Sequence, residues 1–308
     1  MMEAQDMRFT QVVTVGCGID VHKDLITATI RKSNEKLETH EYNAYTSSLK
    51  SLRDWCKDEK VTHVAMESTG VYWKPVFNVL EEDFEVILVN ARHVKNVPGH
   101  KTDKKDSRWL SKLLLSGLLK GSFIPPVDIR ELRDLTRYKK KVIAQAASEK
   151  NRIIKILEDA NIKLSSVLSN IDGAVGTKII NSMIEGKTDI DELMKFYHGK
   201  IKIGKKEFRL ALEGKVTKHH QFMLQLHKDS IADKERLIER IDAEIDEAIK
   251  AYQVEIDLLQ TIPGVGKNSA IGIISEIGVD MGRFPDENHL SSWAGMSPGN
   301  NETGGKKK

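Results

Sequence analysis

The alternation of apolar and polar residues in the first third of the chain predicts short strands and helices in a regular order. Residues 12–32 carry two strand patterns, VVTVGCGIDV and LITATIRK, and the short break VHKD between them indicates a hairpin. EKLETHEY, residues 35–42, predicts a third strand. Leu49, Leu52 and Trp55 recur at a spacing of three, which is typical of a helix over residues 46–57.

The next elements alternate between buried strands and helices. THVAME (62–67) and FEVILV (84–89) predict two short buried strands. Between them VYWKPVFNVLEED predicts a helix with Pro75 in its first turn, and residues 106–119 predict another helix with the apolar run LSKLLLSGLL. The resulting order, β-β-β-α-β-α-β-α, is the pattern of a ribonuclease-H-like fold with helices on both faces of a mixed sheet.

Beyond Pro125 and Pro126 the pattern becomes helical. Residues 128–164 and 218–259 each predict one long helix, either arms of an antiparallel or dimerising coiled coil or parts of a local helical bundle. Glycines interrupt the helical pattern of residues 165–217, and this segment predicts a small helical insert. We therefore expect an α/β domain over residues 1–124, an all-α region over 128–257 with its insert at 165–217, and a C-terminal domain over 258–308.

The segment LLQTIPGVGKNSA predicts a helix, a tight turn and a second helix. Gly264 and Gly266 allow backbone N–H groups to approach a ligand, and the N-terminus of the next helix, which begins near Lys267, suits a phosphate. This is the helix-hairpin-helix type of backbone contact to nucleic acid. A plain helix-capping turn is the alternative.

Composition narrows the class of protein. The chain has 308 residues, 40% of them apolar, and a net charge of +3, so the overall charge identifies no partner. Residues 130–155 nevertheless hold nine Lys or Arg and three Asp or Glu, which favours a surface that faces a polyanion. Cys17 and Cys56 belong to no CxxC motif, so we expect reduced thiols near a core. Without an 18-residue apolar run or a signal peptide, the chain is expected to be cytoplasmic.

Four carboxylates carry the candidate chemistry. Asp20 and Glu67 each close a predicted strand, and Asp103 and Asp106 lie three residues apart at the start of a helix. Four acids that converge repel one another unless a cation neutralises them, and hard oxygen ligands favour Mg²⁺ or Mn²⁺. Two such ions can act on a phosphodiester. The alternative is that these acids simply pair with nearby bases.

Basic residues close to these acids, and others further along the chain, are candidate contacts to a phosphate backbone. They are Lys101, Lys104, Lys105, Arg108, Arg137, Lys139, Lys140 and Lys141, with Lys267 at the C-terminal turn. His22 could be a further ligand, although a histidine in a strand turn is more often structural. His219 and His220 are adjacent on a helix and point apart, so they make a poor metal site.

Five motifs in order resemble the transposases of the insertion sequence 110 family: GIDVHKD, AMESTGVYWKPV, HKTDKKDSRWL, LLQTIPGVGKNSA and WAGMSPGNNETGGK. The resemblance implies a RuvC-like domain whose D-E-D-D metal site matches Asp20, Glu67, Asp103 and Asp106. It also implies a coiled coil used for dimerisation and a C-terminal transposase domain with a nucleophilic serine. Members of this family are DNA recombinases guided by a structured bridge RNA.

The chain departs from that pattern at the nucleophile. Thr303 stands where the family carries serine, and Ser297 lies just upstream. A threonine hydroxyl can act as a nucleophile when a base or a metal activates it, although it is more hindered. The chain ends at three lysines where relatives continue, so we expect the C-terminal domain to be truncated.

We therefore predict an RNA-guided, Mg²⁺-dependent DNA transposase or recombinase of a bacterial or archaeal insertion sequence. Its expected partners are the element ends, target DNA, bridge RNA and further copies of the chain in a homodimer or homotetramer, with no membrane. Three alternatives stay open: a junction-resolving nuclease without a covalent intermediate, an actin-like phosphotransferase, and a non-catalytic nucleic-acid-binding protein.

Overall fold

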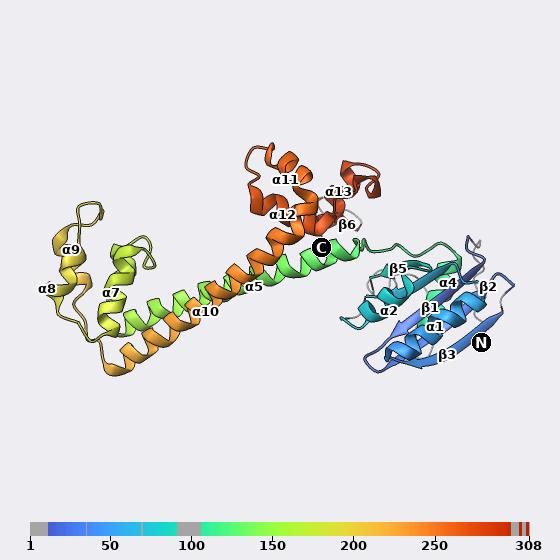
Figure 1. Ribbon diagram of the computed structural model, residues 1–308, viewed down its shortest axis with the longest axis horizontal. Helices are drawn as coiled ribbons and strands as arrows, with labels where there is room; N and C mark the ends of the chain where they lie inside the picture. Colours follow the sequence, from blue (N-terminus) through green and yellow to red (C-terminus); the bar gives the residue numbers. More distant parts are fainter. Residues whose placement is uncertain are drawn as a thin grey trace. The chain divides into compact units, whose positions relative to one another are not determined.

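The computed structural model describes residues 12–34, 36–68, 70–90 and 106–296, and the backbone of residues 302–303 and 306–307. Within these residues the chain divides into two compact units, residues 1–124 and 125–308. Figure 1 shows a sheet-containing first unit and a helical second unit. No helix among the described residues is long and apolar enough to cross a membrane.

The first unit is built on a mixed five-stranded sheet in the order β3-β2-β1-β4-β5. Its elements are β1 (Val15–Val21), β2 (Leu25–Lys32), β3 (Leu37–Asn43), α1 (Thr46–Asp58), β4 (His63–Glu67), α2 (Trp73–Leu80), β5 (Glu85–Val89) and α4 (Asp106–Leu115). Strand β2 pairs antiparallel with both β1 and β3, whereas β1 pairs parallel with β4, and β4 pairs parallel with β5. The predicted α/β domain with a central mixed sheet is confirmed.

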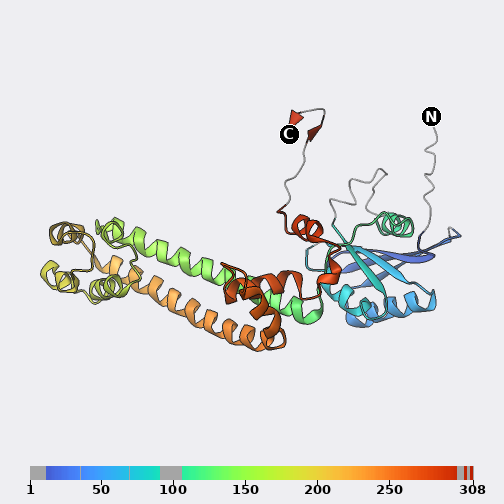
Figure 2. The same cartoon turned by 90° about the horizontal axis from the view of Figure 1, so that it is seen from above.

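Helices cover both faces of this sheet, as Figure 2 shows, with α1 and α2 on one face and α4 on the other. The larger core lies beneath α1 and α2 and includes Cys17 and Cys56, which are both buried, free thiols as predicted. Burial raises the pKa of the Cys17 thiol, and the neighbouring Cys56 raises it further. A smaller core under α4 contains Val89, Leu110 and Leu113.

Helix α4 ends at Leu115, four residues before the predicted end. Gly117 has a φ of +64°, and its N–H donates to the Leu114 carbonyl. The Leu118 N–H donates to the Leu113 carbonyl, which completes the Schellman arrangement that closes a helix. The apolar run continues past this point outside the helix, so the prediction from hydrophobicity alone placed the end of the helix too late.

Among the described residues, the second unit contains two long helices, short helices between them and after them, and a pair of short strands. Its elements are α5 (Val127–Asp159), α6 (Leu164–Val167), α7 (Ala174–Ile184), α8 (Ile190–Leu193), η2 (Met194–Phe196), α9 (Lys205–Ala211), α10 (Lys218–Ala248), η3 (Ile249–Tyr252), α11 (Gln253–Gln260), α12 (Lys267–Ile277), η4 (Met281–Arg283), α13 (Glu287–Trp293), β6 (Glu302–Thr303) and β7 (Lys306–Lys307). The predicted single helix over 218–259 is therefore three helical segments.

Helices α5 and α10 lie antiparallel along each other within one chain (Figure 1). Asp159 at the end of α5 contacts His220 near the start of α10, and Lys139, nearer the start of α5, pairs with Asp242 near the end of α10. One apolar core packs the C-terminal end of α5 and the N-terminal part of α10 against the insert. A second core packs the N-terminal end of α5 and the C-terminal part of α10 against α11 and α12. Of the arrangements left open by the sequence, the chain adopts an intramolecular antiparallel pair.

Candidate metal centre and nucleic-acid interface

Strand β1 divides its side chains between the two faces of the sheet. Cys17, Ile19 and Val21 point into the core beneath α1 and α2. Gly16, Gly18 and Asp20 alternate with them, so they face the layer that contains α4. Asp20 therefore lies on the α4 side, at the carboxyl end of the strand.

Gly18 lets α4 pack directly on the sheet. A Cβ atom at this position would lie 2.2 Å from the Ser107 carbonyl oxygen and 2.4 Å from the Ser111 amide nitrogen, both of which are backbone atoms. Any side chain would displace the helix. This close approach, fixed also by a 2.8 Å hydrogen bond between the Thr29 and Ser107 hydroxyls, places the first turn of α4 near the end of β1.

Glu67 occupies the equivalent position on the neighbouring strand. β1 and β4 pair in parallel with Ile19 opposite Met66, so Asp20 and Glu67 are the next residues on each strand. Met66 points into the core beneath α1 and α2, and Glu67 therefore points to the α4 side, like Asp20. The Asp20 side chain is 19% exposed and lies 3.2 Å from the Nε2 atom of His22, which is 65% exposed.

Asp106 is the first residue of α4, and its Oδ1 atom is shielded from solvent. Asp20, Glu67 and Asp106 thus lie on one face of the sheet and at one end of it. Asp103, Lys101, Lys104 and Lys105 lie outside the described residues. Arg108 is exposed, and its Nε atom donates to the Thr39 hydroxyl at 3.4 Å.

The donor chemistry of these residues fits a hard divalent cation, because all the candidate ligands are carboxylate oxygens. Among the residues that the structure describes, no group of three or more His, Cys, Asp or Glu side chains is close enough to hold an ion. The three described carboxylates therefore share a face and an end without forming a complete ligand set by themselves.

His220, one of the two adjacent histidines at the start of α10, has hydrogen-bonding partners. The Thr217 backbone N–H donates to His220 Nδ1 at 3.1 Å, and His220 Nε2 lies 2.8 Å from an Asp159 oxygen. His220 therefore closes the N-terminus of α10 and links it to α5. This role is structural.

Several basic residues predicted to contact phosphate are held in ion pairs where α12 packs on α5 and α10, a region we call the α12 junction. Arg137 donates to both carboxylate oxygens of Glu276, at 2.9 and 2.7 Å. Lys139 pairs with Asp242, and Lys267 pairs with Asp246 at 2.8 Å. Lys140 and Lys141 are exposed.

A cavity of about 470 Å³ lies at this junction, and its lining includes Lys139, Lys140 and Lys267. The structure thus brings Lys267 together with Lys139 and Lys140, two predicted phosphate contacts from which the sequence separates it widely. Asp242 and Asp246 line the same cavity, so its positive charge is partly balanced. The sequence pattern gave no indication of these acids as partners, because pairing across helices depends on their packing.

The predicted turn between two helices joins α11 to α12. The Val265 N–H donates to the Ile262 carbonyl at 3.0 Å, with Pro263 and Gly264 at the two central positions. Gly264 has a φ of +87°, which a type II turn requires at its third residue. A Cβ atom at Gly264 or Gly266 would meet open space, so the backbone there is accessible from outside.

The backbone of Thr303 lies in β6, where it pairs with Lys306 of β7. Ser297 lies outside the described residues. The structure therefore gives Thr303 a strand position, and its role as a nucleophile stays a prediction.

The five-stranded sheet, its covering helices and the strand-end acids are consistent with an α/β, ribonuclease-H-like domain of the DEDD class, followed by a helical C-terminal part. Residues 17–162 match the DEDD transposase family of IS110, and residues 256–308 match a second family described as Transposase IS116/IS110/IS902 family. The chain belongs to the IS110 family of transposases. Membership in a DEDD family implies dependence on a divalent metal ion.

One curated relative is y4qE of Sinorhizobium fredii strain NGR234, a protein whose name describes it as a transposase. It is 22% identical to this chain over 224 residues. The alignment covers 71% of this chain and 46% of the relative, so the chain spans about half the length of that protein.

Proposed function

We propose that this protein is a DNA transposase that cuts and joins phosphodiester bonds with a divalent-metal-dependent acidic site. Its ligands would be Asp20, Glu67, Asp103 and Asp106, and its metal Mg²⁺ or Mn²⁺. The observation that carries the proposal is the position of Asp20, Glu67 and Asp106 on one face and at one end of the sheet. When bound, the metal supplies charge stabilisation at the scissile phosphate.

The chain's own residues have separate roles in this proposal. Asp20 and Glu67 are held by paired strands, so the sheet sets their spacing, and Gly18 sets the position of Asp106 through α4. The Thr303 hydroxyl is the proposed nucleophile that attaches to DNA. DNA and a guide RNA are the proposed partners, and a homodimer or homotetramer is the proposed assembly, with α5 and α10 as candidates for its coiled-coil contacts.

Glu67→Gln tests the acidic site, and Glu85→Gln is its matched control. Glu85 lies at the opposite end of the neighbouring strand β5 and pairs with His63 at 3.0 Å. On supercoiled DNA that carries the element ends, with the element's RNA and Mg²⁺, Glu67→Gln is expected to cleave roughly 100-fold more slowly. Glu85→Gln is expected to match wild type. Wild-type cleavage by Glu67→Gln would overturn the proposal.

Thr303→Ala separates the transposase from a junction-resolving nuclease with the same acidic site. If Thr303 is the nucleophile, the variant forms no covalent protein–DNA adduct and produces no joined strands. Full cleavage by Thr303→Ala, with wild-type protein forming no adduct, would instead favour the nuclease.

A further inference from the structure

The insert between α5 and α10 contains a strongly basic stretch that lies between the two family matches. Residues 195–209, which we call the 195–209 segment, hold six Lys or Arg and a single acid, Glu207. Its cations are exposed: Lys195, Lys200, Lys202, Lys205, Lys206 and Arg209. Nothing in the proposed DNA chemistry uses them, so they need an explanation of their own.

This segment is a folded surface and not a loose tail. Phe208 is fully buried in the insert core, and its ring lies 5.3 Å from that of Tyr197. The Tyr197 hydroxyl donates to the Ile203 carbonyl at 3.0 Å, which closes the loop between η2 and α9. Ile201 and Ile203 pack against the core, and the alternating Lys200 and Lys202 are therefore directed outward.

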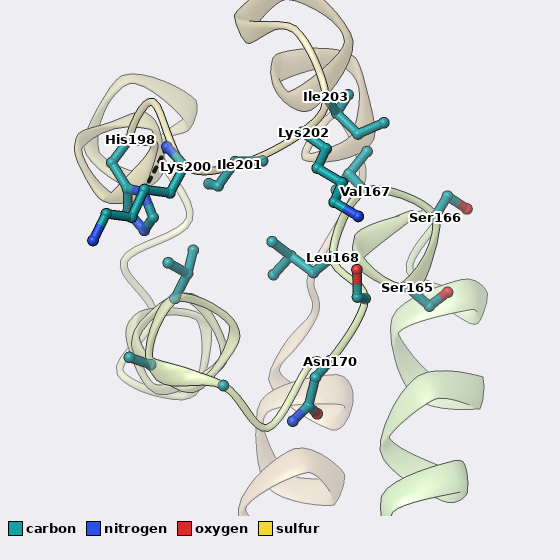
Figure 3. A pocket seen from close by; sticks show the side chains of 14 residues that line it. Ser165, Ser166, Val167, Leu168, Asn170, His198, Lys200, Ile201, Lys202 and Ile203 are labelled. Atoms are coloured by element: carbon teal, nitrogen blue, oxygen red, sulfur yellow. Dashed lines mark hydrogen bonds between the residues drawn. The ribbon is translucent and has the colours of Figure 1, made fainter.

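The loop forms one wall of a cavity of about 460 Å³. The opposite wall comes from residues 165–170, and the lining residues there include Asn170. Figure 3 shows the hydroxyls of Ser165 and Ser166 pointing away from the loop. Figure 3 shows Lys202 reaching from the loop toward the chain that carries Val167 and Leu168, whereas Lys200 turns away beside His198. The cavity thus combines an apolar floor with cationic and hydrogen-bonding groups at its rim.

A second cavity, of about 660 Å³, is lined by other residues of the same segment. Its lining includes Lys195, Lys205, Lys206 and Arg209. Arg209 pairs with Asp191, but within the described part of the chain no carboxylate forms an ion pair with the four lysines Lys200, Lys202, Lys205 and Lys206. Four lysines without ion-pair partners among the described residues, two at each cavity, suit an extended polyanion.

We propose that the 195–209 segment binds single-stranded nucleic acid. Phosphates lie along the lysines, and one unpaired base enters the cavity between the loop and residues 165–170. A duplex cannot offer an unpaired base, and the size of the cavity and its apolar floor suit a single base. The inference rests on the proposed nucleic-acid activity but concerns a surface outside the acidic site. Single-stranded RNA and DNA share this chemistry, and a ribose 2′-hydroxyl adds a hydrogen-bonding partner for the Asn170 amide.

The test removes four charges from the segment and compares that with removing charge elsewhere in the same unit. The variant K200Q/K202Q/K205Q/K206Q, and its twofold form K200Q/K202Q, are compared with K155Q/K178Q, which changes two exposed lysines outside both cavities. A Lys→Arg version of the fourfold variant keeps the charge. Binding of the full chain to fluorescein-labelled 20-nucleotide single-stranded RNA, single-stranded DNA and duplex DNA is measured by anisotropy in EDTA, so that no metal-dependent chemistry takes part.

The fourfold Gln variant is expected to bind single strands at least about tenfold more weakly, with a salt slope shallower by about 3. The Arg version and K155Q/K178Q are expected to stay within about twofold of wild type. Tighter binding to RNA than to DNA assigns the partner as RNA, and the reverse assigns it as DNA. Unchanged binding by the fourfold Gln variant, or binding of wild type to duplex alone, overturns the inference.

Two controls separate this inference from the proposed function. Asp106→Asn is expected to bind single strands as wild type does in the same assay, since the acidic site is not used there. Lysine acetylation with and without oligonucleotide, read by mass spectrometry, is expected to show protection at Lys200 and Lys202 but not at Lys155. Equal labelling of all three lysines would contradict the binding site even if the fourfold variant had lost its fold.

Discussion

The α12 junction and the 195–209 segment are both rich in lysine and arginine, but they balance that charge differently. At the junction Arg137, Lys139 and Lys267 each have a carboxylate partner. In the 195–209 segment Arg209 has one, and Lys200 and Lys202 form no ion pair with the described residues. The density of basic residues in a sequence therefore does not distinguish a surface that binds a polyanion from one that holds helices together.

The junction cations also perform a clear structural task. Arg133 donates to the carbonyls of Ser275 and Glu276 at 3.0 and 2.6 Å, which anchors the C-terminal end of α12 on α5. Arg137 then binds the Glu276 side chain. We infer that part of the charge read from the sequence as a nucleic-acid contact is used to hold α12 in place.

The largest effect is expected from Phe208→Ala, which leaves every charge of the 195–209 segment in place. Truncation of a fully buried Phe costs about 3–5 kcal/mol, because it removes apolar contacts and leaves a cavity. Urea unfolding is expected to show this loss of unfolding free energy. Anisotropy is expected to show that single-strand binding weakens at least as much as it does in the fourfold Gln variant. Retained binding would mean that charge alone, and not its arrangement, decides affinity.

Glu276→Gln is expected to have an intermediate effect, since it removes the partner of Arg137. The expected loss of unfolding free energy is about 1–2 kcal/mol, which allows for partial exposure of the pair. Burial raises the pKa of Glu276, but the hydrogen bond from Arg137 and the charges of Arg137 and Arg133 outweigh it and lower the pKa.

The lowered pKa fixes the sign of the pH dependence. A carboxylate with a lower pKa in the folded state contributes stability above its unfolded value, about 4.3, and loses it as the pH falls through the folded value. Wild type is therefore expected to lose more stability than Glu276→Gln between pH 5 and about pH 3. Parallel pH profiles of the two proteins in thermal unfolding would contradict this role of the ion pair.

The smallest effect is expected from Asp242→Asn with Asp246→Asn, which frees Lys139 and Lys267. Because exposed ion pairs contribute roughly 0–1 kcal/mol, stability is expected to change little. Affinity for duplex DNA at low salt is expected to rise a fewfold, since two cations lose their counter-charges. Unchanged affinity would show that the junction does not face DNA, and a large loss of stability would show that its pairs are structural.

The sheet and the positions of its acids could be predicted from the sequence because both follow from local alternation. VAME ends a strand on Glu67, GIDV ends a strand one residue after Asp20, and the period of two places both acids on a definite face. The close packing at Gly18 could not be predicted, since it depends on where α4 crosses the sheet.

The ion pairs of the second unit could not be predicted from the sequence either. Arg137 and Glu276 are far apart in the sequence and meet only because α12 docks on α5. The cavity in the insert arises from two loops that no motif marks, and its lysines alternate with isoleucines over too short a run to predict a surface. Charge pairing between distant elements is a property of packing and not of local pattern.

The central claim is that the sheet-end carboxylates bind a divalent ion, and Mn²⁺ binding followed by electron paramagnetic resonance tests it most directly. Wild type is expected to bind Mn²⁺, and Glu67→Gln at least about tenfold more weakly, while Glu85→Gln binds as wild type does. Equal Mn²⁺ binding by wild type and Glu67→Gln would contradict the account.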